Sequence, residues 1–135
     1  TIRNHYQVRA ALESMACLLC CRNGADLSAV ENSLISARNA LAGNDSSSYS
    51  NYNQSFHYEI WKASDNEKLI NMLSELWNGL SMGLKTTEAE YAKVSQEEHE
   101  RIFAAMAAAD GEKAGREMFC HIERSMKDVL TRYQE

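Results

Sequence analysis

The chain has 135 residues, which is enough to form one hydrophobic core and too few for two independent ones. Its 44% hydrophobic and 24% charged residues are typical of a globular protein in water, and no apolar run reaches the ~18 residues of a membrane span. Fourteen Lys and Arg against nineteen Asp and Glu give a net charge of −5, which disfavours holding a nucleic-acid backbone by charge. We therefore exclude a membrane protein and expect that this segment does not bind DNA or RNA itself.

The composition also favours helices. Proline, the strongest helix breaker, is absent from the sequence, and no alternating run of β-branched residues indicates a strand. We predict an all-α fold, an antiparallel bundle of about six helices joined by short loops. Because the chain opens at Thr1 without a methionine or a signal stretch, we expect it to be a piece of a longer protein.

The first helix is predicted from His5 to Asn23, where Gly24 supplies the left-handed residue that commonly closes a helix. Its apolar positions at helical spacing are Leu12, Met15, Ala16 and Leu19. Cys17 and Cys20 have the spacing of a metal clip, but a second such pair is absent. We interpret these cysteines, with Cys21, as small buried hydrophobes of a cytoplasmic protein.

Asp26 is expected to cap a second helix that ends at Gly43, and the polar segment 44–48 after it is the clearest loop. The apolar stripe of this second helix is Leu27, Val30, Leu34 and Leu41. In the third helix, Asn53 and His57 lie beside a stripe that steps by four residues. That stripe consists of Tyr52, Phe56 and Ile60.

The pair Asp65-Asn66 is expected to cap a fourth helix, and the segment 86–94 that follows this helix is expected to be irregular. The apolar seam of the fourth helix is Leu69, Leu73, Leu76, Leu80 and Leu84. Ser95 and Glu98 form a capping box at the start of the fifth helix, whose stripe is Ile102, Phe103 and Met106. The chain turns near Asp110 and Gly111. The last helix carries Ala114, Met118, Ile122, Met126, Val129 and Tyr133 toward the core.

Three of the four histidines lie beside apolar stripes on three different helices, namely His57, His99 and His121, and only His5 looks incidental. Imidazoles from facing helices, joined by one oxygen ligand, can hold a divalent transition metal inside a bundle. Asn53 lies one turn before His57, so its side-chain oxygen could join the same ion. The residues leave open the alternative that each histidine is an inward-facing, hydrogen-bonded side chain without a metal.

Four motifs follow one another along the chain in a fixed order. They are R-x-x-L-E from Arg9 to Glu13, F-H at Phe56 with A-S-x-N from Ala63 to Asn66, E-H-x-x-I-x-x-A from Glu98 to Ala105, and A-D-x-x-x-A-x-x-x-M-x-x-H from Ala109 to His121. In order and spacing the chain resembles, nearly end to end, the FCD domain. This is the C-terminal effector-binding domain of the FadR-like subfamily of GntR transcription regulators.

The resemblance implies a helical bundle around a cavity in which one Asp and three His hold a metal, with a small organic acid at its open position in many members. His57, His99 and His121 match the three histidines, but Asn53 occupies the aspartate position. A neutral amide is a weaker ligand than a carboxylate, so metal affinity should fall or selectivity should shift toward Zn or Ni, with Mn still possible. Arg9 would bind the carboxylate of the acid, or else pair with Glu13 on its own helix.

The function implied by the resemblance is that of a sensor. Residues 1–135 would form one homodimeric effector-binding domain of a bacterial transcription regulator, not an enzyme, and would act on DNA only through an N-terminal winged-helix domain absent from this chain. Two alternatives are a purely structural metal site and a metal-dependent hydrolase. Against the hydrolase, the H-E-x-x-H pattern that starts at His99 fails at Phe103.

Overall fold

The computed structural model describes the backbone of residues 1–81 and 90–133 and the side chains of residues 1–79 and 90–132. All regular structure in these ranges is helical, which confirms the all-α prediction. The elements are α1 (Ile2–Asn23), α2 (Ser28–Ala42), α3 (Ser46–Ala63), α4 (Glu67–Leu76), a π-helical turn η1 (Trp77–Ser81), α6 (Ala92–Ala107) and α7 (Gly111–Tyr133). Across the described part of the chain, the helices lack the combination of length and apolar character that crossing a membrane requires.

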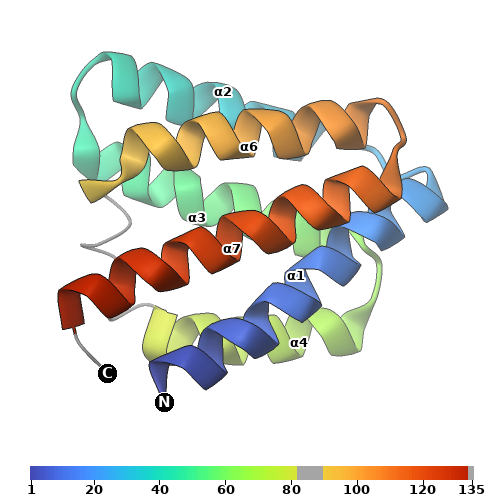
Figure 1. Ribbon diagram of the computed structural model, residues 1–135. Helices are drawn as coiled ribbons and strands as arrows, with labels where there is room; N and C mark the ends of the chain where they lie inside the picture. The colour runs from blue at the N-terminus through green and yellow to red at the C-terminus, as the bar shows by residue number, and fades with distance from the viewer. Residues whose placement is uncertain (82–89, 134–135) are drawn as a thin grey trace.

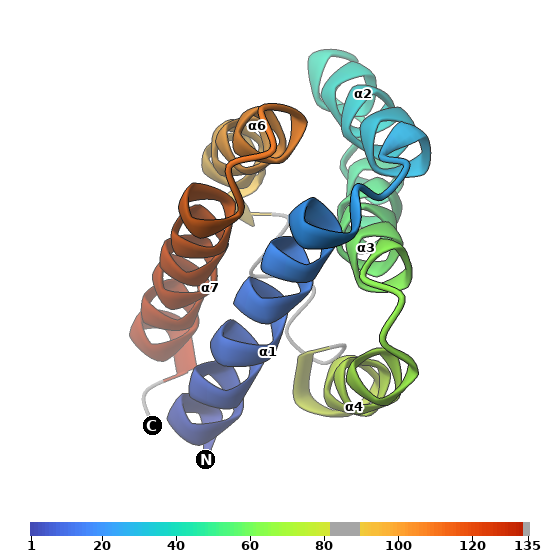
Figure 2. The ribbon, with the colours of Figure 1, turned by 90° about the vertical axis from the view of Figure 1, so that its right-hand side faces the viewer.

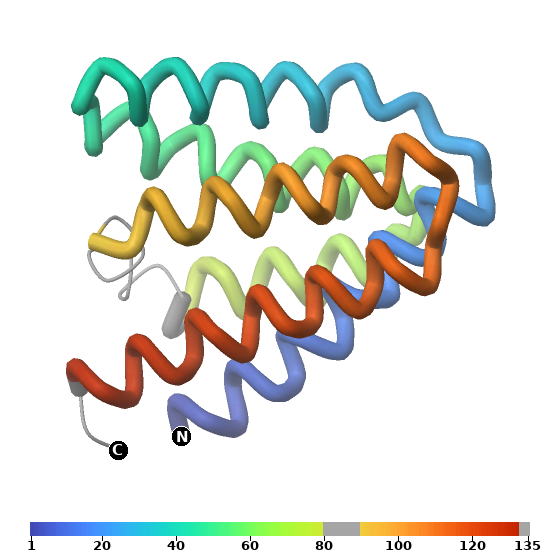
Figure 3. Tube along the Cα trace, turned by 45° about the horizontal axis from the view of Figure 1, so that its top comes forward, coloured from blue at the N-terminus to red at the C-terminus, as the bar shows by residue number. Residues whose placement is uncertain are grey.

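The helices form an antiparallel bundle in which two pairs of consecutive helices pack along each other. α2 packs along α3, α6 packs along α7, and α1 returns against α7, its most extensive partner (Figure 1). α1 contacts α3, α4, α6 and α7, so it is the central helix, as the end-on view shows (Figure 2). α1 begins and α7 ends at the same end of the bundle (Figure 3).

Four helices end through a residue in the left-handed conformation. At Gly24, with φ of 62°, the Ala25 N–H donates to the Cys20 carbonyl at 3.0 Å, as predicted for the end of α1. The same conformation follows α2 at Asn44, α3 at Asp65 and α6 at Ala109, and none of these residues is a glycine. Gly111 instead begins α7 at a close approach to α1, because a Cβ there would lie 2.9 Å from the Leu18 side chain.

Helix starts agree with the predictions less closely. Asn66 caps α4 as expected, since its side chain accepts from the Leu69 N–H at 3.0 Å. α2 begins at Ser28, one residue later than an Asp26 cap would place it, although the Asp26 carboxylate accepts from the Ser28 N–H. The predicted loop 44–48 is wrong beyond residue 45, because Asp45 accepts from the Ser48 N–H and makes the serines the first turn of α3.

The buried faces of α6 and α7 are those predicted, and they include Ile102, Met106, Met118 and Ile122. α1 is rotated about its axis relative to the prediction, which leaves Met15 44% exposed. On α3, Phe56 and Ile60 are buried as predicted, whereas Tyr52 is 39% exposed. The buried face of α1 consists of Tyr6, Arg9, Ala10, Glu13, Ala16, Cys17 and Cys20. Leu84 lies outside the described residues, as do the side chains of Leu80 and Tyr133.

Cysteines agree with the packing interpretation. Cys17 is fully buried and Cys20 is 2% exposed, while Cys21 is half-buried and Cys120 is exposed. The Cys20 thiol donates to the Ile60 carbonyl on α3 at 3.3 Å. The thiols of α1 therefore fill the contact between α1 and its neighbours.

Candidate metal and effector site

Three histidines from three helices converge in the interior of the bundle. His57 on α3, His99 on α6 and His121 on α7 are each at most 1% exposed, and one ligand atom of each lies within 4.8 Å of the others. The Nε2 atoms of His99 and His121 are 3.1 Å apart. The structure thus brings together the three histidines that the sequence singled out, while His5 lies outside this cluster.

Carboxylates orient two of these rings. The Nδ1 atom of His57 lies 2.5 Å from Oε1 of Glu13, and that of His121 lies 2.6 Å from Oε1 of Glu98. An ionised carboxylate only accepts hydrogen bonds, so each Nδ1–H donates and Nε2 of the neutral ring keeps its lone pair. This is the tautomer that a metal ligand needs, and a carboxylate on the other ring nitrogen is the usual outer partner of such a ligand.

Glu13 is fully buried on α1 and ties three side chains together. Its Oε1 also accepts from Nε1 of Trp61 at 3.0 Å, and its Oε2 accepts from Nε of Arg9 at 2.6 Å. Burial alone would raise the pKa of Glu13, but the neighbouring His57 and Arg9 hold that pKa well below its usual range. The carboxylate is therefore ionised in the core.

Glu98 contacts Nδ1 of His121 in the same way as Glu13 contacts Nδ1 of His57. Arg124 on α7 donates to it from Nη2 at 2.6 Å and from Nε at 3.1 Å, and also donates to the Ser95 hydroxyl at 2.8 Å. Burial raises the pKa of Glu98, but the hydrogen bonds from His121 and Arg124 prevail and lower it to about 2. The carboxylate of Glu98 is therefore also ionised.

The capping box predicted at Ser95 and Glu98 is wrong. α6 begins at Ala92, within the segment 86–94 expected to be irregular, of which residues 86–89 lie outside the described part of the chain. Ser95 and Glu98 are consequently inside the helix and turn toward α7, where they contact Arg124. Glu98 serves the histidine cluster rather than the helix terminus.

Burial lowers the pKa of both His57 and His99. For His99 the neighbouring His121, His57, Arg124 and Arg9 act in the same direction. Both rings are therefore neutral at neutral pH, which leaves a nitrogen lone pair on each for a cation.

Asn53 lies on α3 one helical turn before His57 and is 3% exposed. Its Oδ1 atom has no hydrogen-bond partner among the described residues. A buried polar atom left in this state costs about 1–3 kcal/mol, and a cation is one group that would satisfy it. The amide thus matches the oxygen ligand expected from the sequence.

These side chains fit a divalent transition metal. Three imidazoles and one amide oxygen form a borderline donor set that suits Zn or Ni. The Nε2 atoms of His99 and His121, 3.1 Å apart, are close enough to be ligands of one ion.

Arg9 is buried beside this cluster, at 6% exposure. Its guanidinium lies 4.5 Å from the ring of Trp77 and pairs with Glu13, so the pairing along α1 that the sequence offered as one reading of Arg9 is present. That bond engages one of the five N–H donors of the guanidinium. The positive charge of Arg9 also contributes to the lowered pKa of His57 and His99, which places its field at the cluster.

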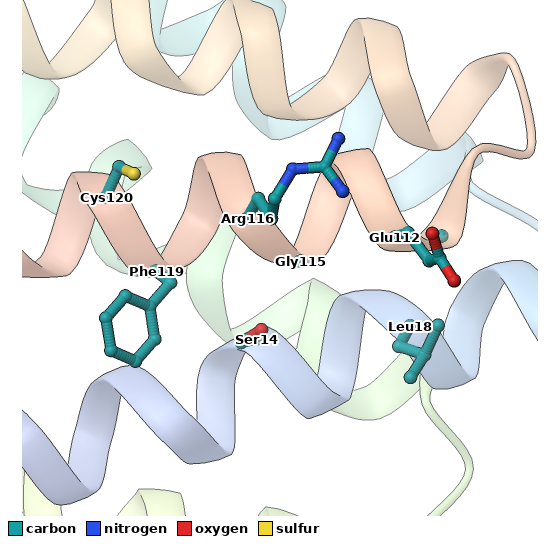
Figure 4. Close-up of a pocket in the computed structure, with 8 residues that line it drawn as sticks. Ser14, Leu18, Glu112, Gly115, Arg116, Phe119 and Cys120 are labelled. Carbon is teal, nitrogen blue, oxygen red and sulfur yellow. The ribbon is translucent and has the colours of Figure 1, made fainter.

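Of two hollows on the surface, one lies next to the buried side chains around Glu13 and the other contains none of the predicted site residues. A groove of about 430 Å³ between α1 and α7, lined by Leu18, Arg116 and Phe119 among others, contains none of the predicted site residues (Figure 4). A smaller hollow of about 270 Å³ between α3 and the α4–η1 region is lined by Trp61 and Trp77. These two indoles contact Glu13 and Arg9, so the smaller hollow adjoins the buried network.

Sequence comparison identifies the family of the chain. Residues 4–124 match the family model described as the FCD domain, a range that includes the histidine cluster, both carboxylates and Arg9. No curated protein matches the chain.

Proposed function

Because the chain belongs to the FCD domain family, the effector-binding domains of GntR-type transcription regulators, we propose that it senses a small organic acid through a divalent transition metal. The observation that carries this proposal is the convergence of three buried histidine nitrogens within 4.8 Å. His57, His99 and His121 would hold the ion together with Asn53. Zn and Ni suit this donor set best, and Mn is the third candidate.

The ion would supply a positive charge and an open coordination position to an anionic ligand. Glu13 and Glu98 fix the orientation of His57 and His121 through their Nδ1 atoms. Arg9 would contact the carboxylate of the acid with the guanidinium donors that point away from Glu13. A carboxylate is therefore the chemical class that this site recognises.

Binding would act on helix packing. The histidines come from α3, α6 and α7, and Glu13 links them to α1. An acid that prefers one arrangement of these four helices would shift the population toward it. In a cytoplasmic homodimer of the FadR subfamily, this shift would reposition a winged-helix domain outside residues 1–135, through which alone the regulator contacts DNA.

Elemental analysis tests the metal site. Protein purified without chelator or a histidine tag is expected to contain one equivalent of Zn, Ni or Mn. His57→Ala and His121→Ala should lose this metal, whereas His5→Ala, outside the cluster, should keep it. Circular dichroism checks that each variant is folded. Wild-type protein that neither contains nor binds metal, or metal retained by both cluster variants, would contradict the proposal.

A thermal-shift screen of small carboxylates, with and without metal, tests sensing. The sensor is expected to melt at a higher temperature with its acid only when the metal is bound. Arg9→Lys, which keeps the charge that pairs with Glu13 but loses the planar fork, should weaken the effect of the acid. Destabilisation by chelation without a response to any acid would instead favour a purely structural metal site.

A further inference from the structure

We propose that the metal and the organic acid bind this cavity as a pair, because the acid supplies the negative charge that the metal-binding side chains lack. This inference rests on the function proposed above and concerns the same site. It predicts that each partner binds much more tightly when the other is present.

The ligand side chains contribute no formal charge. A histidine ligates a metal as a neutral imidazole, and the side chain of Asn53 is an amide. Neither of the ionised carboxylates beside the cluster is available to the ion, because Glu13 and Glu98 are engaged by the Nδ1 atoms of His57 and His121. The ion would therefore have four neutral ligands.

The surrounding charges do not compensate for this. Glu13 pairs with Arg9, and Glu98 pairs with Arg124, so each carboxylate is matched by a guanidinium. Asp128 also pairs with Arg124, but its side chain is 20% exposed. The five groups are Glu13, Arg9, Glu98, Arg124 and Asp128, and their charges sum to −1. This is less than the two negative charges that would neutralise a divalent ion. Burying a divalent ion without a sufficient counter-charge is strongly unfavourable, and an anion bound directly to the ion removes most of this cost.

Reciprocity follows from thermodynamics. If the acid raises the affinity for the metal by some factor, the metal raises the affinity for the acid by the same factor, typically about 5- to 150-fold. A site with an aspartate at position 53 would already contain one negative charge, so its metal would need the acid less. With Asn53, the domain responds to the simultaneous presence of metal and acid.

The experiment measures the Zn²⁺ dissociation constant of the chain by competition with a chromophoric chelator. Acetate in excess is the anionic probe, and acetamide is its neutral counterpart of the same shape. For the wild-type protein we expect acetate to tighten Zn²⁺ binding by about fivefold or more and acetamide to leave it unchanged. This comparison requires no variant, so it decides the matter even if a substitution impairs folding.

Asn53→Asp places the missing charge inside the site. In acetate-free buffer it should bind Zn²⁺ about tenfold more tightly than wild type, and acetate should then improve binding less than about twofold. Asn51→Asp adds the same charge at an exposed position of α3 and should behave like wild type.

The outcomes separate this inference from the proposed function. Zn²⁺ binding by wild type that acetate and acetamide affect equally would overturn the pairing and leave the metal site intact. The same conclusion would follow if Asn53→Asp kept the full response to acetate. If no form of the protein binds Zn²⁺, the metal site and the pairing are both wrong.

Discussion

Glu13→Gln is the substitution for which the structure gives the sharpest expectation. Three donors converge on this carboxylate, the Nδ1–H of His57 and the Nε1–H of Trp61 on one oxygen and the Nε–H of Arg9 on the other. Glutamine has one acceptor oxygen and one NH₂ group, so either orientation of the amide points a donor at a donor. It also leaves the buried Arg9 without its counter-ion.

The expected loss of stability follows from this geometry. Breaking a buried ion pair by removing one partner costs about 3 kcal/mol or more, and we expect Glu13→Gln to lower the free energy of unfolding by about that amount at neutral pH. Urea denaturation followed by circular dichroism measures it. The matched control is Glu117→Gln, which removes a largely exposed pair with Arg101 and should cost less than about 1 kcal/mol.

The pH dependence provides a second readout. The pKa of Glu13 is lowered in the folded state. The stability that its ionised carboxylate contributes is therefore fully present above pH 4.5, which is the ordinary pKa of a glutamate. It is lost as the pH falls further, because the unfolded chain then takes up the proton more readily than the folded one. The difference between wild type and Glu13→Gln should therefore shrink below pH 4.5. A difference under about 1 kcal/mol at neutral pH would refute the assignment of Glu13 as the buried counter-ion of Arg9.

Two further predictions concern the helix ends and the thiols. Ala109→Gly should stabilise the protein by about 0.5–1 kcal/mol in thermal unfolding, because Ala109 has a φ of 57°, whereas Ala104→Gly within α6 should destabilise it by about 1 kcal/mol. A loss of stability in Ala109→Gly would count against the left-handed end. A thiol reagent at pH 8 should modify the exposed Cys120 quickly and the buried Cys20, whose pKa burial raises to about 12, only after unfolding. Fast labelling of Cys20 in folded Cys120→Ser would show that the first helix is more open than described.

The fold could be predicted largely from the sequence because helical periodicity and capping are local. Asn66 starts α4 and Gly24 ends α1 where the sequence predicted these helix ends. The turn predicted near Asp110 and Gly111 is present, but its left-handed residue is Ala109, which no local signal distinguishes from other alanines. On α1, counting only apolar residues gave the wrong face, because the buried face includes Arg9 and Glu13.

The site was predicted in part. The three histidines could be found because each lies beside an apolar stripe, and the structure places them together. The roles of Glu13 and Glu98 could not be derived in the same way. Each contacts a histidine more than 20 residues away, at separations of 44 and 23 residues, so the pairing depends on how the helices pack. The i, i+4 spacing of Arg9 and Glu13 was the available signal for a shared face.

The distribution of the histidines over α3, α6 and α7 has a kinetic consequence. Their nitrogens meet only after three helices from distant parts of the chain have docked, and His99 and His121 alone are 22 residues apart. An ion bound there would stabilise the native state without helping the chain reach its folding transition state. We therefore expect metal to slow unfolding while leaving the folding rate nearly unchanged. The metal-bound domain should then be cleaved more slowly by proteases wherever cleavage requires the whole domain to unfold.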